Sequence, residues 1–573
     1  MKLIHKIFLV ALVFSMSACQ MFDLDLLDNP NKATLDDANT DNLYNNVQLN
    51  FKNFLNDMWY PTSTLSRMLC NANAYNYLSA YSPESFNTVW YRAYASLLPD
   101  MDLTIEKASN NGLGIYIGSI KVMKAYVLMA MVDMFGDVPY SEYGQGTDII
   151  APGNDSGSSI YAIAQGLLDE AISDINGATN TTKPSGDLIF GGTGTKWVTA
   201  ANSMKLRLAL TTRLVDGSAG SKIAAIVNGG DLIDQTSEDM QINFGSNRDN
   251  PNSRHWLYNT DYENGDPDFQ SNYYMWLLRA EKRNEDGTVA VIDPRIRFYF
   301  YRQTDKLSDN PNDWSCHFSE LPNNASRPAY YSAIDPDMPY CIAGEDGYWG
   351  RDHLNSEGVP PDGNFRTGYG LYPAGGQFDD NSFAVIKKLG TTGGLGKGIA
   401  PILLASYVDF MRAEAALTAN TGEDARALLE SGVKKSIEKV IGFKSLVPTT
   451  MSRTVVDRQN NSATIEELYV PDAEDIQKYV DFVLARYDAA SDKLDVVMKE
   501  YFIALWGNGL EAYNMYRRTG KPNNMAPALE SNPGAFIRSF LYPANNVNLN
   551  SNATQKALTV QVFWDNNPAD FVY

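Results

Sequence analysis

Apolar residues recur every three or four positions between residues 160 and 175. The stripe consists of Ile160, Ile163, Ala164, Leu167, Leu168, Ala171, Ile172 and Ile175. Because an α-helix repeats every 3.6 residues, this spacing puts all of these side chains on one face. The segment is therefore predicted to be an amphipathic helix that buries this face.

Similar stripes predict helices elsewhere in the chain. They comprise Val122, Tyr126, Met129 and Val132, before a stop at Gly136 and Pro139; Trp197, Leu206, Leu208 and Leu214; Leu404, Val408, Met411 and Ala415; and Phe502, Trp506, Tyr513 and Tyr516. Short helices with apolar stripes and short turns are typical of stacked tetratricopeptide-like pairs, although the strict repeat consensus is absent. The pattern predicts a mainly α fold of such pairs with few short strands.

Residues 216–400 follow a different pattern. They are rich in Gly, Pro, Asn and Asp, contain scattered aromatic residues and show little lasting periodicity, so a loop-rich region is predicted there. The mainly helical regions 41–215 and 400–573 flank it. We expect residues 41–573 to form one interdigitated body rather than separate domains.

The N-terminus has the pattern of a cleavable export signal. Lys2 and Lys6 precede an apolar run from Ile7 to Phe14, which is far shorter than the roughly 20 residues that cross a bilayer. Cys19 directly follows Ser17 and Ala18. A cysteine at this place is typical of bacterial lipoproteins, because its thiol takes the diacylglycerol; the alternative is an ordinary signal with a chance cysteine.

The expected mature protein therefore begins at Cys19, after removal of residues 1–18. Cys19 would carry diacylglycerol and an N-acyl chain, a membrane anchor stronger than one myristoyl chain. Residues 19–40, with Asp23, Asp25 and Asp28, are predicted to be a lipidated tether. The lipid is expected to be the protein's only contact with the membrane.

Composition narrows the class of partner. The 68 acidic and 47 basic residues give a net charge of −21, which repels nucleic acid and argues against DNA or RNA binding. Aromatic residues are abundant, with 33 Tyr, 24 Phe and 9 Trp. Because Tyr and Trp combine a flat apolar face with a polar edge, their surplus indicates a ligand surface.

Sequence patterns of catalysis and metal binding are missing. The histidines show no HExxH spacing, and the gaps between Cys316, His317, Cys341 and His353 are not those of a zinc module. The glycines of 390–398 lack phosphate-loop spacing, and no Gly-x-Ser-x-Gly occurs. A glycosidase-like carboxylate pair stays open among so many acidic residues. We predict no enzyme activity, no metal and no cofactor besides the lipid.

The cysteines beyond Cys19 leave two alternatives open. Cys70, Cys316 and Cys341 are too few for a disulfide framework, so at most one bridge forms. Either Cys316 pairs with Cys341 in the irregular region, or all three thiols stay reduced.

An ordered set of motifs resembles the SusD/RagB family of outer-membrane nutrient-binding lipoproteins, in particular its SusD-like starch-binding-associated subgroup. The motifs are Phe135-Gly136-Asp137-Val138-Pro139-Tyr140-Ser141, Leu168-Asp169-Glu170-Ala171-Ile172, Lys196-Trp197 with Ala201–Arg207, Asp293-Pro294-Arg295, Phe410–Ala416, Leu505–Arg518 and Arg538–Pro543. The set spans roughly residues 20–573, with Phe135 where Trp is common. Most of these motif residues, such as Trp197, Arg207, Glu414, Glu511 and Arg518, are expected to have packing roles.

The resemblance implies a surface-exposed, lipid-anchored protein facing the cell exterior. Such proteins form a lid on a SusC-like TonB-dependent outer-membrane barrel and pass glycans to it without catalysing a reaction. Two alternatives stay open: a RagB-like peptide-binding lipoprotein, and a helical-repeat scaffold that binds no small ligand. A hydrolase is the least favoured reading.

Ligand binding is expected at aromatic residues in irregular segments. The candidates are Tyr75, Tyr77 and Tyr81; Trp256 and Tyr258; Tyr273, Tyr274 and Trp276; Trp314; and Tyr348 and Trp349, with the polar neighbours Asn71, Asn73 and Arg254. Sugar rings stack their C–H faces on such side chains while polar groups bind the hydroxyls. Trp256 and Trp276 flank an Asp- and Asn-rich loop, so this loop is the preferred site on the condition that both rings are exposed.

Overall fold

The structure is a computed structural model that describes residues 38–71, 74–264, 268–305, 327–340, 346–354, 366–456, 462–530 and 532–573. The predicted signal peptide, Cys19 and most of the tether lie outside the described residues, as do Asn73, Trp314, Cys316 and Cys341.

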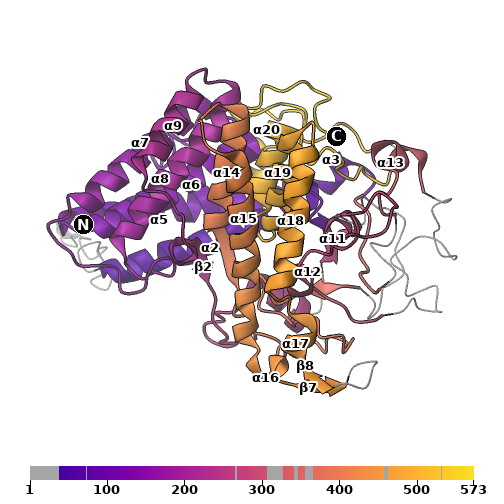
Figure 1. The fold of residues 1–573 in the computed structure, drawn as a ribbon. Helices are drawn as coiled ribbons and strands as arrows, with labels where there is room; N and C mark the ends of the chain where they lie inside the picture. Colours follow the sequence, from indigo (N-terminus) through magenta and orange to yellow (C-terminus); the bar gives the residue numbers. More distant parts are fainter. Residues whose placement is uncertain are drawn as a thin grey trace, which may run out of the picture.

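Consecutive helices build the N-terminal half of the body (Figure 1). These helices are α2 (Thr40–Leu65), α5 (Leu98–Asn110), α6 (Gly114–Phe135), α7 (Gly157–Asn176), α8 (Gly194–Thr211) and α9 (Ala219–Gly229). The stripe predicted for residues 160–175 lies on α7, where Ile160, Ala164, Leu168 and Ala171 are buried. Helix α9 extends the helical run beyond the predicted limit at residue 215.

Helices α6 and α7 pack closely in antiparallel directions. A Cβ atom at Gly118 of α6 would lie 2.5 Å from Cγ1 of Ile175 and 2.8 Å from the carbonyl oxygen of Ala171, both on α7. The absence of a side chain at Gly118 thus allows the two backbones to approach. Among the described helices, only α6 is long and apolar enough to cross a membrane, and 89% of its most apolar window is buried inside the body.

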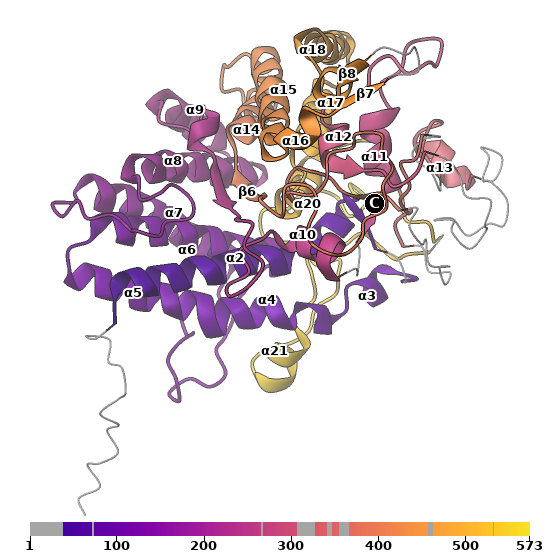
Figure 2. The same cartoon turned by 90° about the horizontal axis from the view of Figure 1, so that it is seen from below.

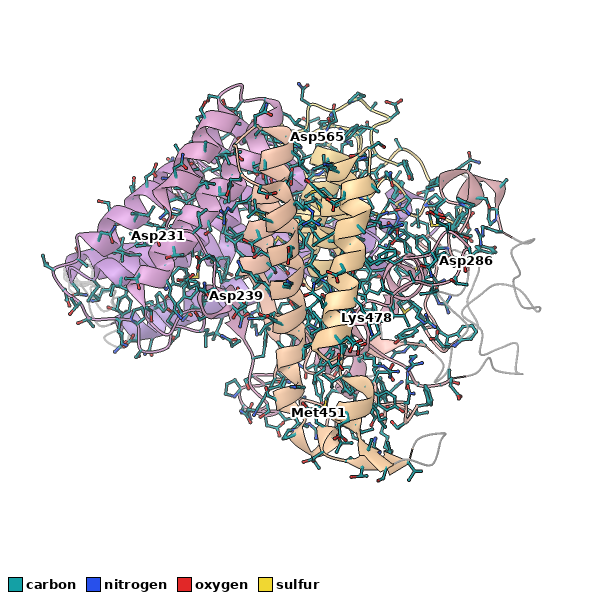
Figure 3. All side chains as sticks on the ribbon, in the orientation of Figure 1. Asp231, Asp239, Asp286, Met451, Lys478 and Asp565 are labelled. Atoms are coloured by element: carbon teal, nitrogen blue, oxygen red, sulfur yellow. The ribbon has the colours of Figure 1, made fainter. Side chains whose placement is uncertain are left out.

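A second group of helices forms the C-terminal half, in which α14, α15, α18 and α19 stand side by side (Figure 1). The group consists of α14 (Ala405–Thr418), α15 (Ala425–Ile441), α18 (Ala473–Ala489), α19 (Lys493–Ala504) and α20 (Gly509–Thr519). Asp239, labelled in Figure 3, fixes this group to the preceding segment: it accepts from the backbone N–H of Ala405 at 2.8 Å and pairs with Lys439 at 2.6 Å.

Short elements connect these groups. The helical ones are α3 (Tyr77–Ala80), η3 (Pro83–Phe86), α4 (Asn87–Tyr91), η4 (Arg92–Leu97), η5 (Thr212–Leu214), η6 (Thr236–Glu238), α10 (Trp256–Tyr258), η7 (Asn259–Asn264), α11 (Asn272–Arg279), α12 (Ile296–Tyr299), α13 (Ala329–Ile334), η9 (Gly442–Leu446), α16 (Pro448–Met451) and α17 (Ile465–Tyr469). Figure 2 shows α5, α4 and α3 in a row along one face.

Strands are few and short, in two-stranded antiparallel sheets. The pairs are β1 (Leu69–Cys70) with β3 (Phe269–Gln270), β2 (Met240–Asn243) with β6 (Ile399–Leu403), β4 (Phe300–Tyr301) with β5 (Gly368–Tyr369), and β7 (Thr454–Val456) with β8 (Ser462–Thr464). The prediction of a mainly α fold with few short strands is confirmed.

Residues 520–573 are less helical than the sequence predicted. In the described part of this segment, the chain forms one short helix, α21 (Ala544–Leu549), and otherwise runs without regular structure. Its frequent prolines explain the difference, because proline has no N–H to donate within a helix. Side-chain contacts hold the segment instead: Arg538 pairs with Asp565 (Figure 3) at 2.6 Å.

Buried ion pairs join the two halves. Arg207 of α8 contacts Asp133 of α6 at 3.1 Å and Glu511 of α20 at 2.8 Å. Arg518 of α20 then contacts Glu511 at 3.1 Å and Glu414 of α14 at 2.8 Å. The five side chains thus link four helices from both ends of the sequence. The motifs that contain these residues are distant in the sequence but in contact in the fold.

Candidate functional site

The preferred loop does not form an exposed aromatic platform. Trp276 is only 3% exposed, and Trp256 is half-buried with its ring against Phe244, at 5.3 Å between centroids. Tyr258 is buried beneath the guanidinium of Arg254, which lies 5.4 Å from the ring centroid. Arg254 is itself buried and pairs with Glu263 at 3.2 Å.

The other aromatic candidates of the irregular region also lie in the core. Tyr273 and Tyr274 are buried on α11, and Tyr274 stacks on Trp506 at 5.1 Å. Tyr348 and Trp349 are buried too. These four rings are therefore buried, whereas stacking on a ligand requires an accessible ring. The reason is physical: the short helix α11 lies within this region and packs into the core, and large aromatic rings gain the most from burial.

The segment between the early helices is partly exposed. Tyr75 is 66% exposed, whereas Tyr77, Tyr81 and Asn71 are buried. Tyr77 nevertheless lines a surface cavity of about 520 Å³. Of the candidate residues predicted from the sequence and described by the structure, Tyr77 is the one that lines this cavity.

The cavity lies where α3, α13 and the end of the chain meet, and the C-terminus is near α13 in Figures 1 and 2. Its lining includes Tyr77, Tyr330, Glu530, Phe536, Asp570 and Tyr573, with small and proline residues between them. Tyr330 and Tyr573 are 36% and 39% exposed, so their rings are accessible from solvent. We take this aromatic cavity as the candidate functional site.

Hydrogen bonds fix the rings of the aromatic cavity. The hydroxyl of Tyr330 donates to the carbonyl of Leu529, and the hydroxyl of Tyr573 donates to the carbonyl of Asn523 at 3.0 Å. The backbone N–H of Tyr77 donates to the carbonyl of Pro533 at 2.8 Å. Rings held in this way need little ordering when a ligand binds.

Burial raises the pKa of the Tyr330 hydroxyl, and the carboxylates of Glu530 and Asp352 raise it further. Burial also raises the pKa of Tyr573 to about 12. Both hydroxyls therefore stay protonated at neutral pH and keep donating to their carbonyl partners. The cavity thus combines fixed neutral rings with carboxylates at its edge.

A buried guanidinium supports the cavity from beneath. Arg67 is fully buried, has a left-handed backbone conformation with φ of 64°, and donates through Nη2 to the hydroxyl of Tyr77 at 2.8 Å. Phe536 packs edge-to-face on Tyr77, at 6.1 Å between centroids. The strained conformation at Arg67 is held by these surrounding contacts.

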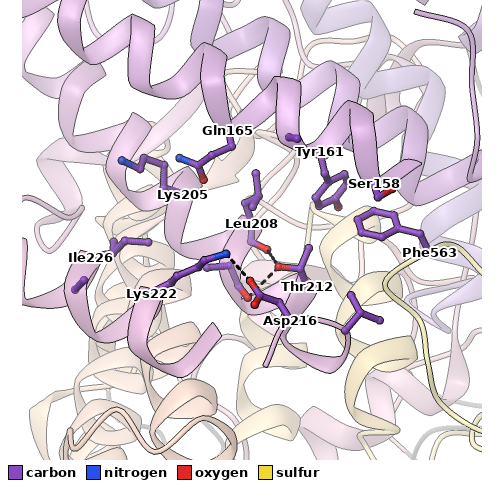
Figure 4. A pocket seen from close by; sticks show the side chains of 14 residues that line it. Ser158, Tyr161, Gln165, Lys205, Leu208, Thr212, Asp216, Lys222, Ile226 and Phe563 are labelled. Carbon is purple, nitrogen blue, oxygen red and sulfur yellow. Dashed lines mark hydrogen bonds and ion pairs between the residues drawn. The ribbon is translucent and has the colours of Figure 1, made fainter. Parts of the chain in front are cut away.

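A larger cavity of about 750 Å³ lies between α7, α8 and α9 (Figure 4). Its two lysines, Lys205 and Lys222, each pair with a carboxylate at 2.6 Å. Its two aromatic residues, Tyr161 and Phe563, pack against each other, at 5.0 Å between ring centroids. This lining is suited to apolar contact but has no accessible pair of rings among its described residues, so we do not favour it as a sugar site.

Metal chemistry finds no support in the described parts of the chain, where no group of three or more His, Cys, Asp or Glu residues could hold an ion. Cys70 is buried, and its thiol donates to the carbonyl of Asp352 at 2.9 Å. The alternatives for Cys316 and Cys341 fall outside the described residues. The site is therefore one of rings, hydroxyls and carboxylates.

Sequence reasoning missed Tyr330, Phe536 and Tyr573. These residues lie more than 30 positions apart and meet Tyr77 only through the fold. The dipeptide Tyr330-Tyr331 is a weak signal, because it lies in the loop-rich region 216–400 that also contains most of the candidate rings. Nothing in the local sequence around Tyr573 indicates a ligand.

Comparisons with known proteins agree on one family. Residues 27–337 match a family profile described as starch-binding associating with outer membrane, and residues 398–568 match the profile of SusD and RagB outer-membrane lipoproteins. No curated protein has a significant match to the sequence.

Solved structures share the fold at low sequence identity. A SusD/RagB family protein from Bacteroides thetaiotaomicron has a TM-score of 0.65 and 16% identity, covering 93% of this chain and 100% of that one. A chitin-binding protein has a TM-score of 0.62 and 19% identity, and the match covers 92% of this chain and 100% of that one. A chitin-binding SusD homologue from Flavobacterium johnsoniae has a TM-score of 0.59 and 17% identity, and the match covers 92% of this chain and 100% of that one. With both halves of the sequence matched by its profiles, the chain belongs to the SusD/RagB family of outer-membrane lipoproteins.

Proposed function

We propose that this protein captures an oligo- or polysaccharide in the aromatic cavity and delivers it to a SusC-like TonB-dependent barrel. The observation that carries the proposal is the pair of accessible, fixed rings of Tyr330 and Tyr573 in one cavity. Two structurally similar proteins are described as chitin-binding, which supports a glycan ligand. The proposed role is binding without catalysis.

The chemistry of the cavity suits a sugar. The C–H face of a pyranose ring stacks on a Tyr ring, while its equatorial hydroxyls project from the edge toward hydrogen-bond acceptors. Glu530 and Asp570 supply such acceptors at the cavity. An open cavity with few contacts gives modest affinity and fast release, which a receptor that feeds a transporter needs.

The proposal includes a lipid anchor on Cys19 and an orientation facing the cell exterior. Replacing Cys19 by Ala should release a folded protein that still binds its ligand but no longer supports uptake by the cells. Fractionation and growth on the glycan as sole carbon source measure both effects. A Cys19→Ala protein that stays on the cells and supports normal uptake would refute the anchor.

Calorimetry with a panel of polysaccharides, including chitin-derived oligosaccharides, tests the glycan part. A Tyr330→Ala/Tyr573→Ala double variant should bind at least about tenfold more weakly, since each ring contributes roughly 1 kcal/mol of stacking. Tyr91→Ala is the matched control, because Tyr91 is 67% exposed on α4 and does not line the cavity.

Other outcomes of the panel identify the alternatives. Binding of peptides with no response to any glycan would favour the RagB-like alternative, and binding of neither would favour the scaffold. Release of shortened sugars from a bound polymer would show that the protein is a hydrolase. Unchanged glycan affinity in the double variant would exclude the aromatic cavity as the site.

A further inference from the structure

The ionisable groups of the aromatic cavity are of one sign. Among the described residues that line it, Glu530 and Asp570 are the charged ones, and no Arg, Lys or His joins them. Asp570 is exposed, and Glu530 is half-buried. A ligand in the cavity therefore meets two carboxylates and no cationic side chain from these residues.

The buried guanidinium that contacts Tyr77, that of Arg67, is already hydrogen-bonded within the protein. Arg67 donates through Nε to the carbonyl of Ala526 at 3.0 Å, through Nη1 to that of Leu65 at 2.6 Å and through Nη2 to the Tyr77 hydroxyl. It is fully buried and does not line the cavity. Its guanidinium thus stabilises Tyr77 but offers no donor to a ligand.

Carboxylates of neighbouring elements add to the negative potential. The pKa of the Tyr330 hydroxyl is raised by burial and, in addition, by the negative charges of Glu530 and Asp352. The pKa of the Tyr573 hydroxyl is raised mainly by burial; Arg67 lowers it, and the carboxylates of Asp495 and Asp335 raise it. The two accessible rings thus sense acidic groups on several sides.

A sugar that stacks on these rings projects its substituents toward the cavity edge. Carboxylates of uronic acids, sulfate esters and amino groups are all such edge substituents. We infer that the aromatic cavity selects neutral or amine-bearing sugars and rejects anionic ones such as uronates and sulfated glycans. This selection rests on the proposed glycan-binding function and names its substrate class.

Three pentasaccharides on one β-1,4-linked glucosamine backbone provide the test: N-acetylated, with free amines, and N-succinylated. Titration calorimetry at low salt and mildly acidic pH, where the sugar amines are protonated and the carboxylates stay ionised, should give the tightest binding for the free amine and weaker binding for the N-acetyl form. The succinylated form should bind at least about fivefold more weakly again, from one like-charge contact near 4 Å in water. Raising salt to about 1 M should compress these differences, because the screening length falls to about 3 Å.

A Glu530→Gln/Asp570→Asn variant should bind the three forms with nearly equal affinity while still binding the N-acetyl form. The control is Glu285→Gln/Asp148→Asn, which makes the same change in net charge at exposed residues outside the cavity and should keep the full selection. The same three charge states are prepared on any other backbone that binds better in the panel.

The outcomes separate the two proposals. Equal affinity of the wild-type protein for the succinylated and N-acetyl forms would overturn the charge selection and leave glycan binding intact. Selection that persists in the Glu530→Gln/Asp570→Asn variant would also overturn it. Failure of every glycan to bind would overturn the proposed function together with this inference.

Discussion

At the scale of single residues, the aromatic side chains show where sequence reasoning succeeds and where it fails. Their surplus predicts a ligand surface, which stays a prediction, and two accessible tyrosines line one cavity. However, the rings chosen from irregular segments, such as Tyr274 and Trp276, pack in the core. A single sequence does not distinguish a ring on a loop's outer side from one beneath it, because both occur among the same turn-forming residues.

Lys556 gives a prediction at this scale. Its ammonium donates to the hydroxyl of Ser539 and lies 5.1 Å from the centroid of the Tyr542 ring. Burial, with a smaller contribution from Arg517, lowers the pKa of Lys556 to about 7 against the opposing effect of Asp137. Between pH 7 and the ordinary lysine range, the unfolded chain binds a proton that the folded protein does not, so stability from this residue rises with pH.

Replacing Lys556 by Met should therefore cost more stability at pH 10 than at pH 7, relative to the wild-type protein. Urea unfolding at several pH values measures this difference. Lys478→Met is the control, because Lys478 (Figure 3) is exposed and pairs with Glu474, which raises its pKa above this window. A wild-type advantage that does not change with pH would show that Lys556 is protonated in the folded protein.

At the scale of elements, the helices were the predictable part of the fold. The stripe on α7 and the stop at Gly136 follow from local sequence, since periodicity and a glycine with φ of 79° are local properties. The packing of one helix on another depends on residues that carry no periodic signal. Gly118 is such a residue, because its importance appears only when α7 lies against it.

Replacing Gly118 by Ala should destabilise the protein by about 1–3 kcal/mol, since the new methyl group overlaps Ile175 and the Ala171 carbonyl. Gly166→Ala on α7 is the matched control: nothing lies within 4 Å of its Cβ position, so the change should stabilise by about 0.5–1 kcal/mol through helix propensity. Denaturant unfolding of both variants measures the pair. Equal effects of the two substitutions would argue against close contact between α6 and α7.

At the scale of the whole molecule, buried ion pairs and the cavity both depend on residues far apart in the sequence. The family motifs indicated which residues pack, but not that Arg207, Glu511 and Arg518 form one connected group. Likewise, no local pattern brings Tyr77, Tyr330 and Tyr573 together. Long-range contacts of this kind depend on the complete topology, so the periodicity of apolar residues does not predict them.

Replacing Arg207 by Met should cost about 3–5 kcal/mol, because Asp133 and Glu511 would remain buried without their partner. The control is Arg426→Met, which breaks the exposed pair with Asp488 and should leave the unfolding midpoint almost unchanged. Thermal unfolding followed by circular dichroism compares the two. An equally small effect at Arg207 would mean that these ion pairs contribute little to holding the two halves together.

The position of Tyr573 in the cavity also sets an order of events. Tyr77 is synthesised well before Tyr573, so the helices of the N-terminal half can pack long before the cavity has its full lining. In the proposed site, ligand affinity would therefore appear only when the segment that carries Tyr573 has packed beside α3 and α13. If the proposed function is correct, a partly folded chain would therefore not compete with the folded protein for the glycan.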